Sequence, residues 1–390
     1  MIFSEIPKTN NGPKSYSQSD FDYLEKSARE DAKCIRDVIE SWISNYPDID
    51  DRKDLIGRFK SNDNLQHTSS AFELYLHELL LCLGYVVSIH PETKNRKSTK
   101  PDFLVQDSNH NQFYIEAVQS IEANQKERSA NTRLNVVYDT INRLTSYDFF
   151  LGLNYKGLPN VDLPGRKLRN ELETWLKSID YNSVLKALEI EGYKSLPKFA
   201  YESHGWKVVF TAIPRNPQNR HKPIVAPIGS FCPEGKWLST WETIRDSIIA
   251  KGKYYGELGL PLVIAVNANV FHLDKIDIMQ ALFGQEQFTF DSSNLDGEPK
   301  MSRAPNGVWY GPQGIRNKEV SAVLIGFDVK PWTFGVRGIC LYRNPWATYP
   351  IKGKICKVDK AESNDGIMKW TEGIHPKDIL KLPTCYPGMI

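Results

Sequence analysis

Three acidic residues in the first third of the chain have the side-chain types and the spacing of a divalent-cation site. Asp102 begins a short apolar run, Glu116 lies near the end of the next one, and Glu73 lies on a preceding helical stretch. In an antiparallel hairpin the start of one strand lies beside the end of the next, so the carboxylates of Asp102 and Glu116 can converge. Mg²⁺ binds one or two carboxylates together with substrate phosphate oxygens. We therefore predict a Mg²⁺ (or Mn²⁺) site formed by Asp102, Glu116 and, directly or through water, Glu73.

One helix and three strands are expected to position these acids. Apolar residues recur at helical spacing over 71–83, and we expect the N-cap within 68–70. Gly84 follows, and glycine readily takes the positive φ that ends a helix. β-branched and aromatic residues then concentrate in three short segments separated by a basic loop and a polar turn. We predict that these segments, 85–90, 103–105 and 113–118, form an antiparallel meander.

A second helix and a fourth strand are expected directly after the meander. Residues 131–145 carry an apolar stripe at helical spacing, and 147–155 have the composition of a strand. A helix that connects two strands of one sheet covers a face of that sheet, so the prediction is an α/β layer architecture. Further strands and helices alternate after residue 160 and predict a long α/β extension of this core.

These residues resemble the PD-(D/E)xK nuclease superfamily, whose restriction-endonuclease-like core is helix, three strands, helix, strand. Pro101-Asp102 looks like the PD of the motif, Glu116 like its second acid, and Glu73 like the glutamate that many members carry on the first helix. The resemblance covers roughly residues 65–155. It implies a metal-dependent nuclease that hydrolyses phosphodiester bonds of DNA or RNA, and by analogy a role in microbial defence or repair.

The chain departs from the motif at its lysine. The family has a lysine two residues after the second acid, where it positions water and offsets developing charge, and this chain has Val118 there. Lys100 is our first substitute, because on an extended segment it shares a face with Asp102. Gln119 is the second, although it needs a β-bulge to turn toward Glu116. The alternative is a catalytically inactive member of the fold that binds nucleic acid or acts as a scaffold subunit.

Nucleic-acid contacts are expected from local basic patches, because the net charge of the whole chain is only +2. Lys94, Arg96 and Lys97 lie in the loop before Asp102 and could hold phosphates, although a solvated loop explains them equally well. Two later segments, 307–317 and 343–350, combine Gly, Pro, aromatic residues and Arg. They suit either stacking on bases or well-packed turns, and they contribute Arg316 and Arg343 as candidate contacts.

The 390 residues are expected to divide into an N-terminal helical segment (1–64), the nuclease-like core (65–160) and an α/β extension of unknown role (161–390). The extension could mediate a homodimer or bind a partner protein. Six scattered cysteines without a CxxC pair argue against structural zinc and against a disulfide framework. The sequence has no apolar run of about 20 residues and no signal peptide, so we expect a cytoplasmic protein without a membrane span.

Overall fold

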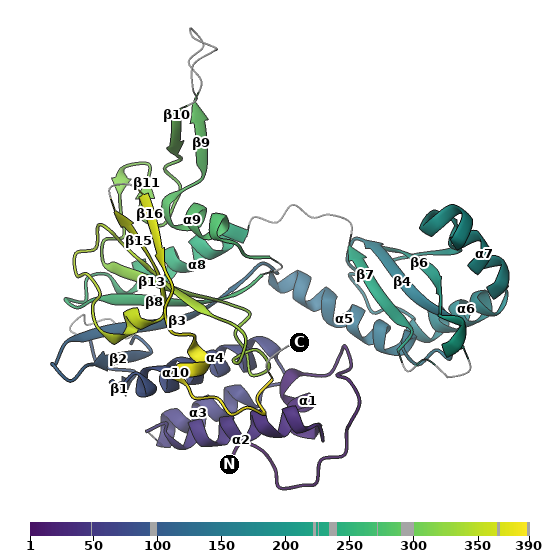
Figure 1. Cartoon of the computed structure of the whole chain (residues 1–390), viewed down its shortest axis with the longest axis horizontal. Coiled ribbons are helices and arrows are strands. Elements are labelled where there is room, and N and C mark those ends of the chain that lie inside the picture. Colours follow the sequence, from purple (N-terminus) through teal and green to yellow (C-terminus); the bar gives the residue numbers. More distant parts are fainter. Residues whose placement is uncertain are drawn as a thin grey trace. The chain divides into compact units, whose positions relative to one another are not determined.

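The computed structural model describes residues 1–47, 49–93, 100–220, 224, 226–233, 240–270, 272–289, 300–364 and 367–387 (Figure 1). The chain forms two compact units. Unit 1 comprises Met1–Gly12, Ser19–Glu122 and Ser239–Ile390, and unit 2 comprises Pro13–Gln18 and Ala123–Leu238. Most of unit 2 is therefore an insertion in unit 1. The residues of unit 1 that flank it meet, because Thr240 Oγ1 donates a hydrogen bond of 2.6 Å to Glu122 Oε1.

Unit 1 begins with four helices. The fourth starts earlier than predicted, because Asp63 accepts a hydrogen bond from the backbone N–H of Leu65 and caps it, so 68–70 lie inside the helix. Gly84, with φ of 78°, follows its end as expected. The bounds are α1 (Asp20–Lys26), α2 (Glu30–Ser44), α3 (Ile49–Phe59) and α4 (Asn64–Cys82).

An eight-stranded mixed sheet forms the centre of unit 1. Its order is β1-β2-β3-β8-β13-β14-β15-β16. The first three strands form the predicted antiparallel meander, after which β8 and β13 run parallel to β3. The bounds are β1 (Val86–Ile89), β2 (Phe103–Gln106), β3 (Gln112–Ile121), β8 (Leu262–Asn269), β13 (Val320–Phe327), β14 (Ile339–Arg343), β15 (Asp359–Asn364) and β16 (Ile367–Thr371).

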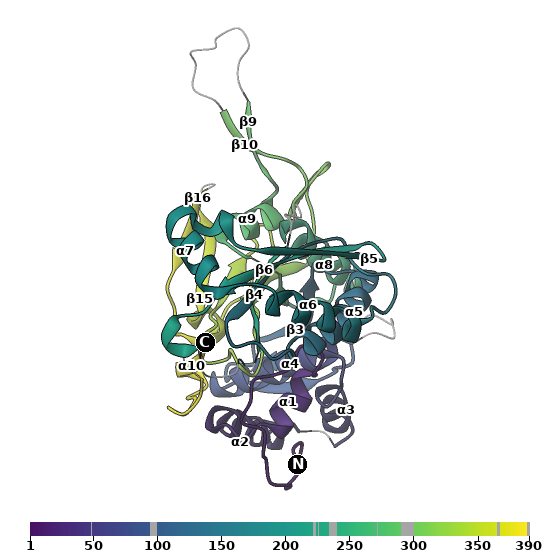
Figure 2. The ribbon, with the colours of Figure 1, turned by 90° about the vertical axis from the view of Figure 1, so that its right-hand side faces the viewer.

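Helices cover both faces of this sheet, so unit 1 has three layers (Figures 1 and 2). Helices α2, α3 and α4 pack with Phe103 and Ile115 in one apolar core. Helices α8 (Thr240–Tyr255) and α9 (Lys275–Phe283) pack with Tyr114 in a second core on the opposite face. The smaller elements of unit 1 are β9 (Glu286–Thr289), β10 (Lys300–Arg303), β11 (Tyr310–Gly311), β12 (Gly314–Ile315) and α10 (Pro376–Ile379).

Unit 2 has its own sheet and its own core. The sheet order is β5-β6-β4-β7, and the core joins it to three helices. The first helix begins with a capping box in which Asn124 and Glu127 bond reciprocally. The bounds are α5 (Gln125–Ile141), β4 (Phe149–Lys156), α6 (Gly165–Lys177), α7 (Tyr181–Glu191), β5 (Lys198–Ser203), β6 (Trp206–Pro214) and β7 (Ile228–Pro233).

The helix and strand expected after the meander form, as α5 and β4, but the prediction that they join the sheet of β1–β3 was wrong. Strand β4 pairs with β6 and β7 in unit 2, and β8 takes the place beside β3. Unit 2 therefore has a core separate from the two cores of unit 1, and the compact units divide at 122/123 and 238/239, with the short segment 13–18 also in unit 2. The fold class is mixed α/β, as expected.

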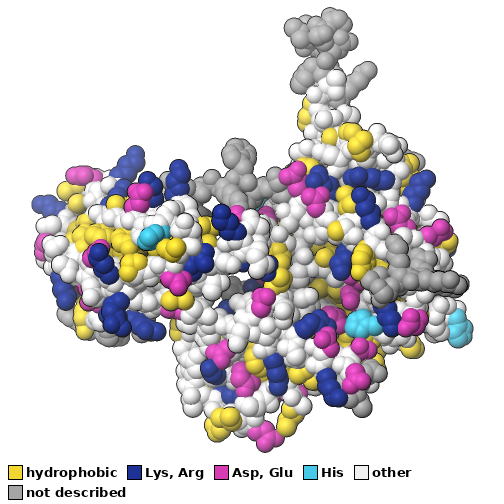
Figure 3. All heavy atoms as spheres, turned by 180° about the vertical axis from the view of Figure 1, so that it is seen from behind, with side chains coloured by type: hydrophobic (Ala, Val, Ile, Leu, Met, Phe, Trp, Pro, Cys, Tyr) yellow, Lys and Arg dark blue, Asp and Glu magenta, His cyan; other side chains and the backbone are white. Residues whose placement is uncertain are grey.

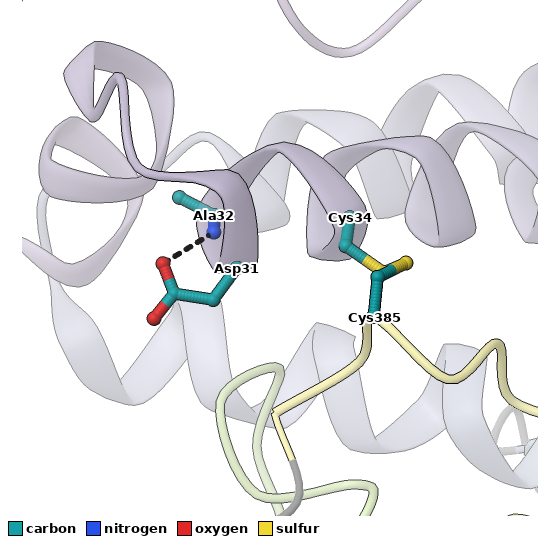
Figure 4. The surroundings of a disulfide bond; sticks show 4 residues. All are labelled: Asp31, Ala32, Cys34 and Cys385. Carbon is teal, nitrogen blue, oxygen red and sulfur yellow. Dashed lines mark hydrogen bonds between the residues drawn. A yellow bond between two sulfur atoms is a disulfide. The ribbon is translucent and has the colours of Figure 1, made fainter.

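Two cysteines at opposite ends of the sequence form a disulfide (Figure 4). Cys34 of α2 bonds to Cys385, and their Cα atoms lie 6.1 Å apart although 351 residues separate them in sequence. The sequence argued against a disulfide framework and gave no sign of this single pair, because spacing along the chain carries no information about so distant a contact. In the part of the chain that the structure describes, no helix combines the length and the apolar character of a membrane span.

Candidate active site

The register of the meander brings Asp102 beside Glu116. Phe103 of β2 pairs with Ile115 of β3, so the residue before β2 lies next to Glu116. The side chain of Asp102 also bonds to β3, because its Oδ2 accepts a hydrogen bond of 2.7 Å from the backbone N–H of Ala117, the residue after Glu116. The two predicted acids are therefore neighbours at the end of the β2–β3 ladder, as the hairpin argument required.

Glu116 is buried against α8 and both of its carboxylate oxygens have partners there. Its side chain is 3% exposed, Oε1 accepts from the ammonium of Lys251, and Oε2 accepts a hydrogen bond of 2.6 Å from the hydroxyl of Tyr255. Burial lowers the pKa of Lys251, but the adjacent Glu116 and Asp102 outweigh it and hold that pKa above its ordinary value. Burial and Glu116 together raise the pKa of Tyr255, so its hydroxyl remains a donor.

Glu73 lies on α4 and has a separate set of partners. Its Oε1 accepts from the hydroxyl of Tyr46 at 2.7 Å, and its Oε2 lies 2.8 Å from a guanidinium nitrogen of Arg58. Burial raises the pKa of Tyr46, and Glu73 adds to the effect. Burial opposes the charge of Arg58, but Glu73 and Asp54 raise its pKa overall. The Glu73 carboxylate is thus held by donors of the chain itself.

Asp102 lies between these two groups and is affected by both. Burial is the main cause that raises the pKa of its carboxyl well above the ordinary range, and the negative charges of Glu116 and Glu73 raise it further. The N–H of Ala117 and the charge of Lys251 act in the opposite direction without cancelling the rise. Because burial and the neighbouring negative charges destabilise the ionised form of Asp102, a bound proton or cation would stabilise this carboxyl group.

The three acids do not lie on one face of the sheet. Ile115 packs into the core on the α4 side and Tyr114 into the core on the α8 side, so strand alternation places Glu116 on the α8 side. Glu73 belongs to the opposite layer. Among the residues that the structure describes, no three His, Cys, Asp or Glu side chains are grouped so that they could hold a metal ion. The oxygen donors of Asp102 and Glu116 fit a hard cation in their chemistry, whereas Glu73 as a third ligand stays a prediction.

The side chains of the two predicted substitutes for the missing lysine are directed away from Glu116, although the carbonyl oxygen of Lys100 accepts a hydrogen bond of 3.2 Å from the hydroxyl of Tyr255. The ammonium of Lys100 lies 2.5 Å from Glu92 Oε1 near the surface, and its geometry does not support the predicted role. Gln119 pairs with Asn267 in a regular ladder without a bulge, so it faces away from Glu116. Its amide oxygen and nitrogen are buried, and no described residue hydrogen-bonds to them.

The predicted nucleic-acid contacts receive no support from the described structure. Arg316 donates to the carbonyl oxygen of Gly307. Arg343 pairs with Glu362 and donates to the carbonyl oxygen of Ile351. Both guanidinium groups therefore hold turns together, which is the alternative interpretation of these segments. The other three predicted contacts, Lys94, Arg96 and Lys97, lie outside the described residues.

Sequence reasoning missed Lys251 and Tyr255 as members of the site. A signal existed: Ile244, Ile248, Lys251 and Tyr255 follow one another at spacings of three or four, so the lysine lies on the apolar stripe of α8. Lysine seldom lies on a buried stripe without a charged partner. That pattern indicates a buried carboxylate nearby, although it does not identify which one.

Comparisons with known proteins identified no relative of this chain. No protein-family profile, curated protein or solved structure matches this chain.

Proposed function

We propose that this chain is a metal-dependent nuclease that hydrolyses phosphodiester bonds of DNA or RNA. The observation that carries the proposal is the contact of three groups: Asp102 beside Glu116, and the ammonium of Lys251 on Glu116. Two converging carboxylates suit Mg²⁺ or Mn²⁺, and an adjacent cation suits a reaction in which negative charge develops on a phosphate. A role in microbial defence or repair, and a cytoplasmic location, remain part of the same proposal by analogy.

The order of elements in unit 1 supports a restriction-endonuclease-like core. With unit 2 set aside, the order is helix α4, strands β1, β2 and β3, helix α8 and strand β8, and β8 runs parallel to β3. This is the helix, three strands, helix, strand order that the resemblance predicts. In this reading unit 2 is inserted between the third strand and the second helix of the core.

Each side chain of the site has a distinct part in the proposed reaction. A cation held by Asp102 and Glu116 would polarise the phosphate and make its bound water more acidic. Lys251, in contact with Glu116, would offset charge on the scissile phosphate, which is the role of the motif's lysine. Tyr255 holds one oxygen of Glu116 and thereby fixes the orientation of that carboxylate. Burial of Glu116 excludes water from its carboxylate and strengthens its interactions with Lys251 and Tyr255.

A catalytically inactive, nucleic-acid-binding member of the fold is the second candidate. It is favoured by the saturation of Glu116 and Glu73, each of which has both oxygens engaged by the chain itself. In such a protein the acids and their cationic partners would be a buried ionic network without a metal. Partner binding through the part of unit 1 that follows unit 2 would then be the role of the chain.

Cleavage of a plasmid and of an RNA pool by purified protein, with Mg²⁺, Mn²⁺ or a chelator, tests the proposal. We expect cleavage with either cation, none with the chelator, and a loss of about 10²-fold or more in Asp102→Asn and in Glu116→Gln. Glu189→Gln, on the exposed surface of α7, is the control that should cleave normally. Calorimetry should show that Mn²⁺ binds the wild type and not the Asp102→Asn, Glu116→Gln double variant. Binding of nucleic acid without cleavage, and without Mn²⁺ binding, would favour the second candidate.

A further inference from the structure

The two units carry opposite net charges. Unit 2 contains 18 Lys and Arg against 11 Asp and Glu, a net charge of +7. Unit 1 contains 31 Lys and Arg against 36 Asp and Glu, a net charge of −5. The value of +2 for the whole chain conceals this difference. A basic unit inserted in an acidic one is the electrostatic pattern of a module that binds a polyanion.

The helices of unit 2 cover only one face of its sheet. Side chains of α5, α6 and α7 pack into one core with Leu151, Leu153, Val208 and Phe210. These strand residues alternate with a second set that points to the other face. No described helix of unit 2 contributes to that second face, which we call the open face. It comprises Phe150, Gly152, Asn154 and Lys156 of β4, Lys207, Val209 and Thr211 of β6, and Lys198, Ala200 and Glu202 of β5.

Cations border the open face at both ends. Lys207 lies directly opposite Lys156 at one end, and both side chains are exposed. Lys198, also exposed, lies opposite Thr211, four residues further along β6. At a rise of about 3.4 Å per residue these two positions are roughly 14 Å apart along the sheet. Glu202, the acid of this face, pairs with Lys207 at 2.9 Å and is exposed as well.

The middle of the open face is flat and partly apolar. Gly152, Ala200 and Thr211 have small side chains, and Val209 is half-buried between them. Phe150 is also half-buried, with the guanidinium of Arg215 at 5.6 Å from its ring centroid. A flat surface with an aromatic ring and an arginine accepts the faces of unpaired bases. Figure 3 shows, at its left, Lys and Arg side chains spread in dark blue over the visible surface of this unit.

We propose that the open face binds single-stranded nucleic acid, with bases over the Phe150 and Val209 region and phosphates at Lys156, Lys198 and Lys207. The inference rests on the proposed function in one respect, because it makes unit 2 the part that holds the substrate. It favours a single strand over a duplex because a duplex would present only phosphates to the small and apolar residues between the lysines.

The test is fluorescence anisotropy with labelled single-stranded DNA, single-stranded RNA and duplex DNA, on the full chain with a chelator present. Lys198→Glu with Lys207→Glu reverses two charges on the open face. Lys177→Glu with Lys186→Glu reverses two exposed charges on α6 and α7, on the covered side of the same unit. Both double variants change the net charge equally, so they separate a specific surface from a general charge effect. Equal melting temperatures check that both are folded.

We expect the open-face variant to bind a single strand at least tenfold more weakly and to lower the log-log salt slope by about 1.4. The covered-side variant should bind within about twofold of the wild type, and Phe150→Ala should weaken binding by about tenfold. Equal losses in the two charge variants, or equal affinity for duplex and single strand, would overturn the proposal. The experiment measures no cleavage and is run with a chelator. A failed nuclease test therefore leaves this result interpretable, and the reverse also holds.

Discussion

At Glu116 a buried carboxylate is held by one ammonium and one phenol that come from a helix far along the chain. Lys251 stands 135 residues after Glu116, yet it supplies the positive charge that the sequence motif would have placed at position 118. Its side chain is 37% exposed while that of Glu116 is 3% exposed, so the ammonium contacts the buried carboxylate and is also accessible to solvent. Under the proposed nuclease function, Lys251 is therefore the residue that best fits the role of the motif's lysine, and Lys100 is not favoured.

Replacing Lys251 should separate chemistry from binding. In Lys251→Ala we expect kcat for nucleic-acid cleavage to fall by about 10²–10³-fold, because an electrostatic contribution made in the transition state is lost. The measurement is single-turnover cleavage with saturating Mg²⁺, with Lys253→Ala, an exposed lysine on the same helix, as the control. Lys251→Arg should recover part of the rate. If Lys251→Ala unfolds the chain and Lys251→Arg cleaves no faster than background, the role assigned to this ammonium is not supported.

His77 gives a prediction for stability against pH. It is 1% exposed, its Nδ1 has no partner among the described residues, and burial lowers its pKa from 6.5 to about 4. Above pH 6.5 the ring is neutral in both states. As the pH falls toward 4 the unfolded chain takes up a proton that the folded chain refuses, so folding free energy is lost progressively.

Denaturant unfolding at pH 7.5 and pH 5 measures this effect. The loss attributable to His77 at pH 5 is about 2 kcal/mol, and His77→Phe, beside the rings of Tyr46 and Phe103, should abolish that part of the pH dependence. The control is His272→Gln, a substitution of an exposed histidine, which should leave the pH dependence of stability unchanged. Identical pH dependence in the wild type and in His77→Phe would show that His77 accepts its proton while folded.

At the scale of elements, unit 2 is an insertion whose removal should leave unit 1 intact. The two cores of unit 1 contain no residue of unit 2, and Glu122 already bonds to Thr240 across the insertion. A chain in which a short Gly/Ser linker replaces 123–238 should therefore fold cooperatively. Circular dichroism and hydrogen exchange check this, and the amides of β3 and β8 should stay protected.

The matched comparison is a chain that lacks β8, the neighbour of β3 in the sheet. Deleting 262–269 removes a strand that is hydrogen-bonded on both sides, so that chain should not fold. If the linker chain were equally unfolded, unit 2 would be an essential part of the core of unit 1 and the division into two units would be wrong. Nucleic-acid binding by the linker chain would also show whether unit 2 is needed for it.

At the scale of the whole molecule, the Cys34–Cys385 disulfide joins the two ends of the sequence. Cross-linking such distant residues restricts the unfolded chain, and a disulfide typically contributes about 2–4 kcal/mol to stability. In non-reducing buffer the Cys34→Ser, Cys385→Ser variant should lose about this much unfolding free energy. With a reducing agent the variant and the wild type should have the same stability.

Cys82→Ser, at an exposed free cysteine, is the control and should behave as the wild type in both buffers. Mass spectrometry of a non-reduced digest should contain the linked peptides. Disulfides are rare in proteins that stay in a reducing cytosol, so the redox state of this pair in cells also tests the cytoplasmic prediction. Two free thiols in protein purified without reductant would contradict the structure at this point.

The sequence by itself determined the local part of the candidate site. The α4 stripe, the three strands and the polar turn depend on residues that are close along the chain, since hydrophobic periods and turn preferences are local properties. Strand alternation and the antiparallel hairpin then fix Asp102 beside Glu116 without knowledge of any distant segment. The same local logic predicted α5 and β4 as a helix and a strand.

Only the tertiary structure decided which helix and strand complete the sheet, and hence which lysine reaches Glu116. Two helix–strand pairs, α5 with β4 and α8 with β8, could supply the strand beside β3. The hydrophobic period of their sequences does not distinguish between them. The residues of β8, LVIAVNAN, are almost all buried, as a central parallel strand covered on both faces requires, whereas those of β4 beyond Leu153 are exposed or only half-buried. A strand with one open face cannot replace one that is buried on both. The choice of β8 brings α8, Lys251 and Tyr255 to the site, and it depends on burial of whole faces across more than a hundred residues, which no local pattern records.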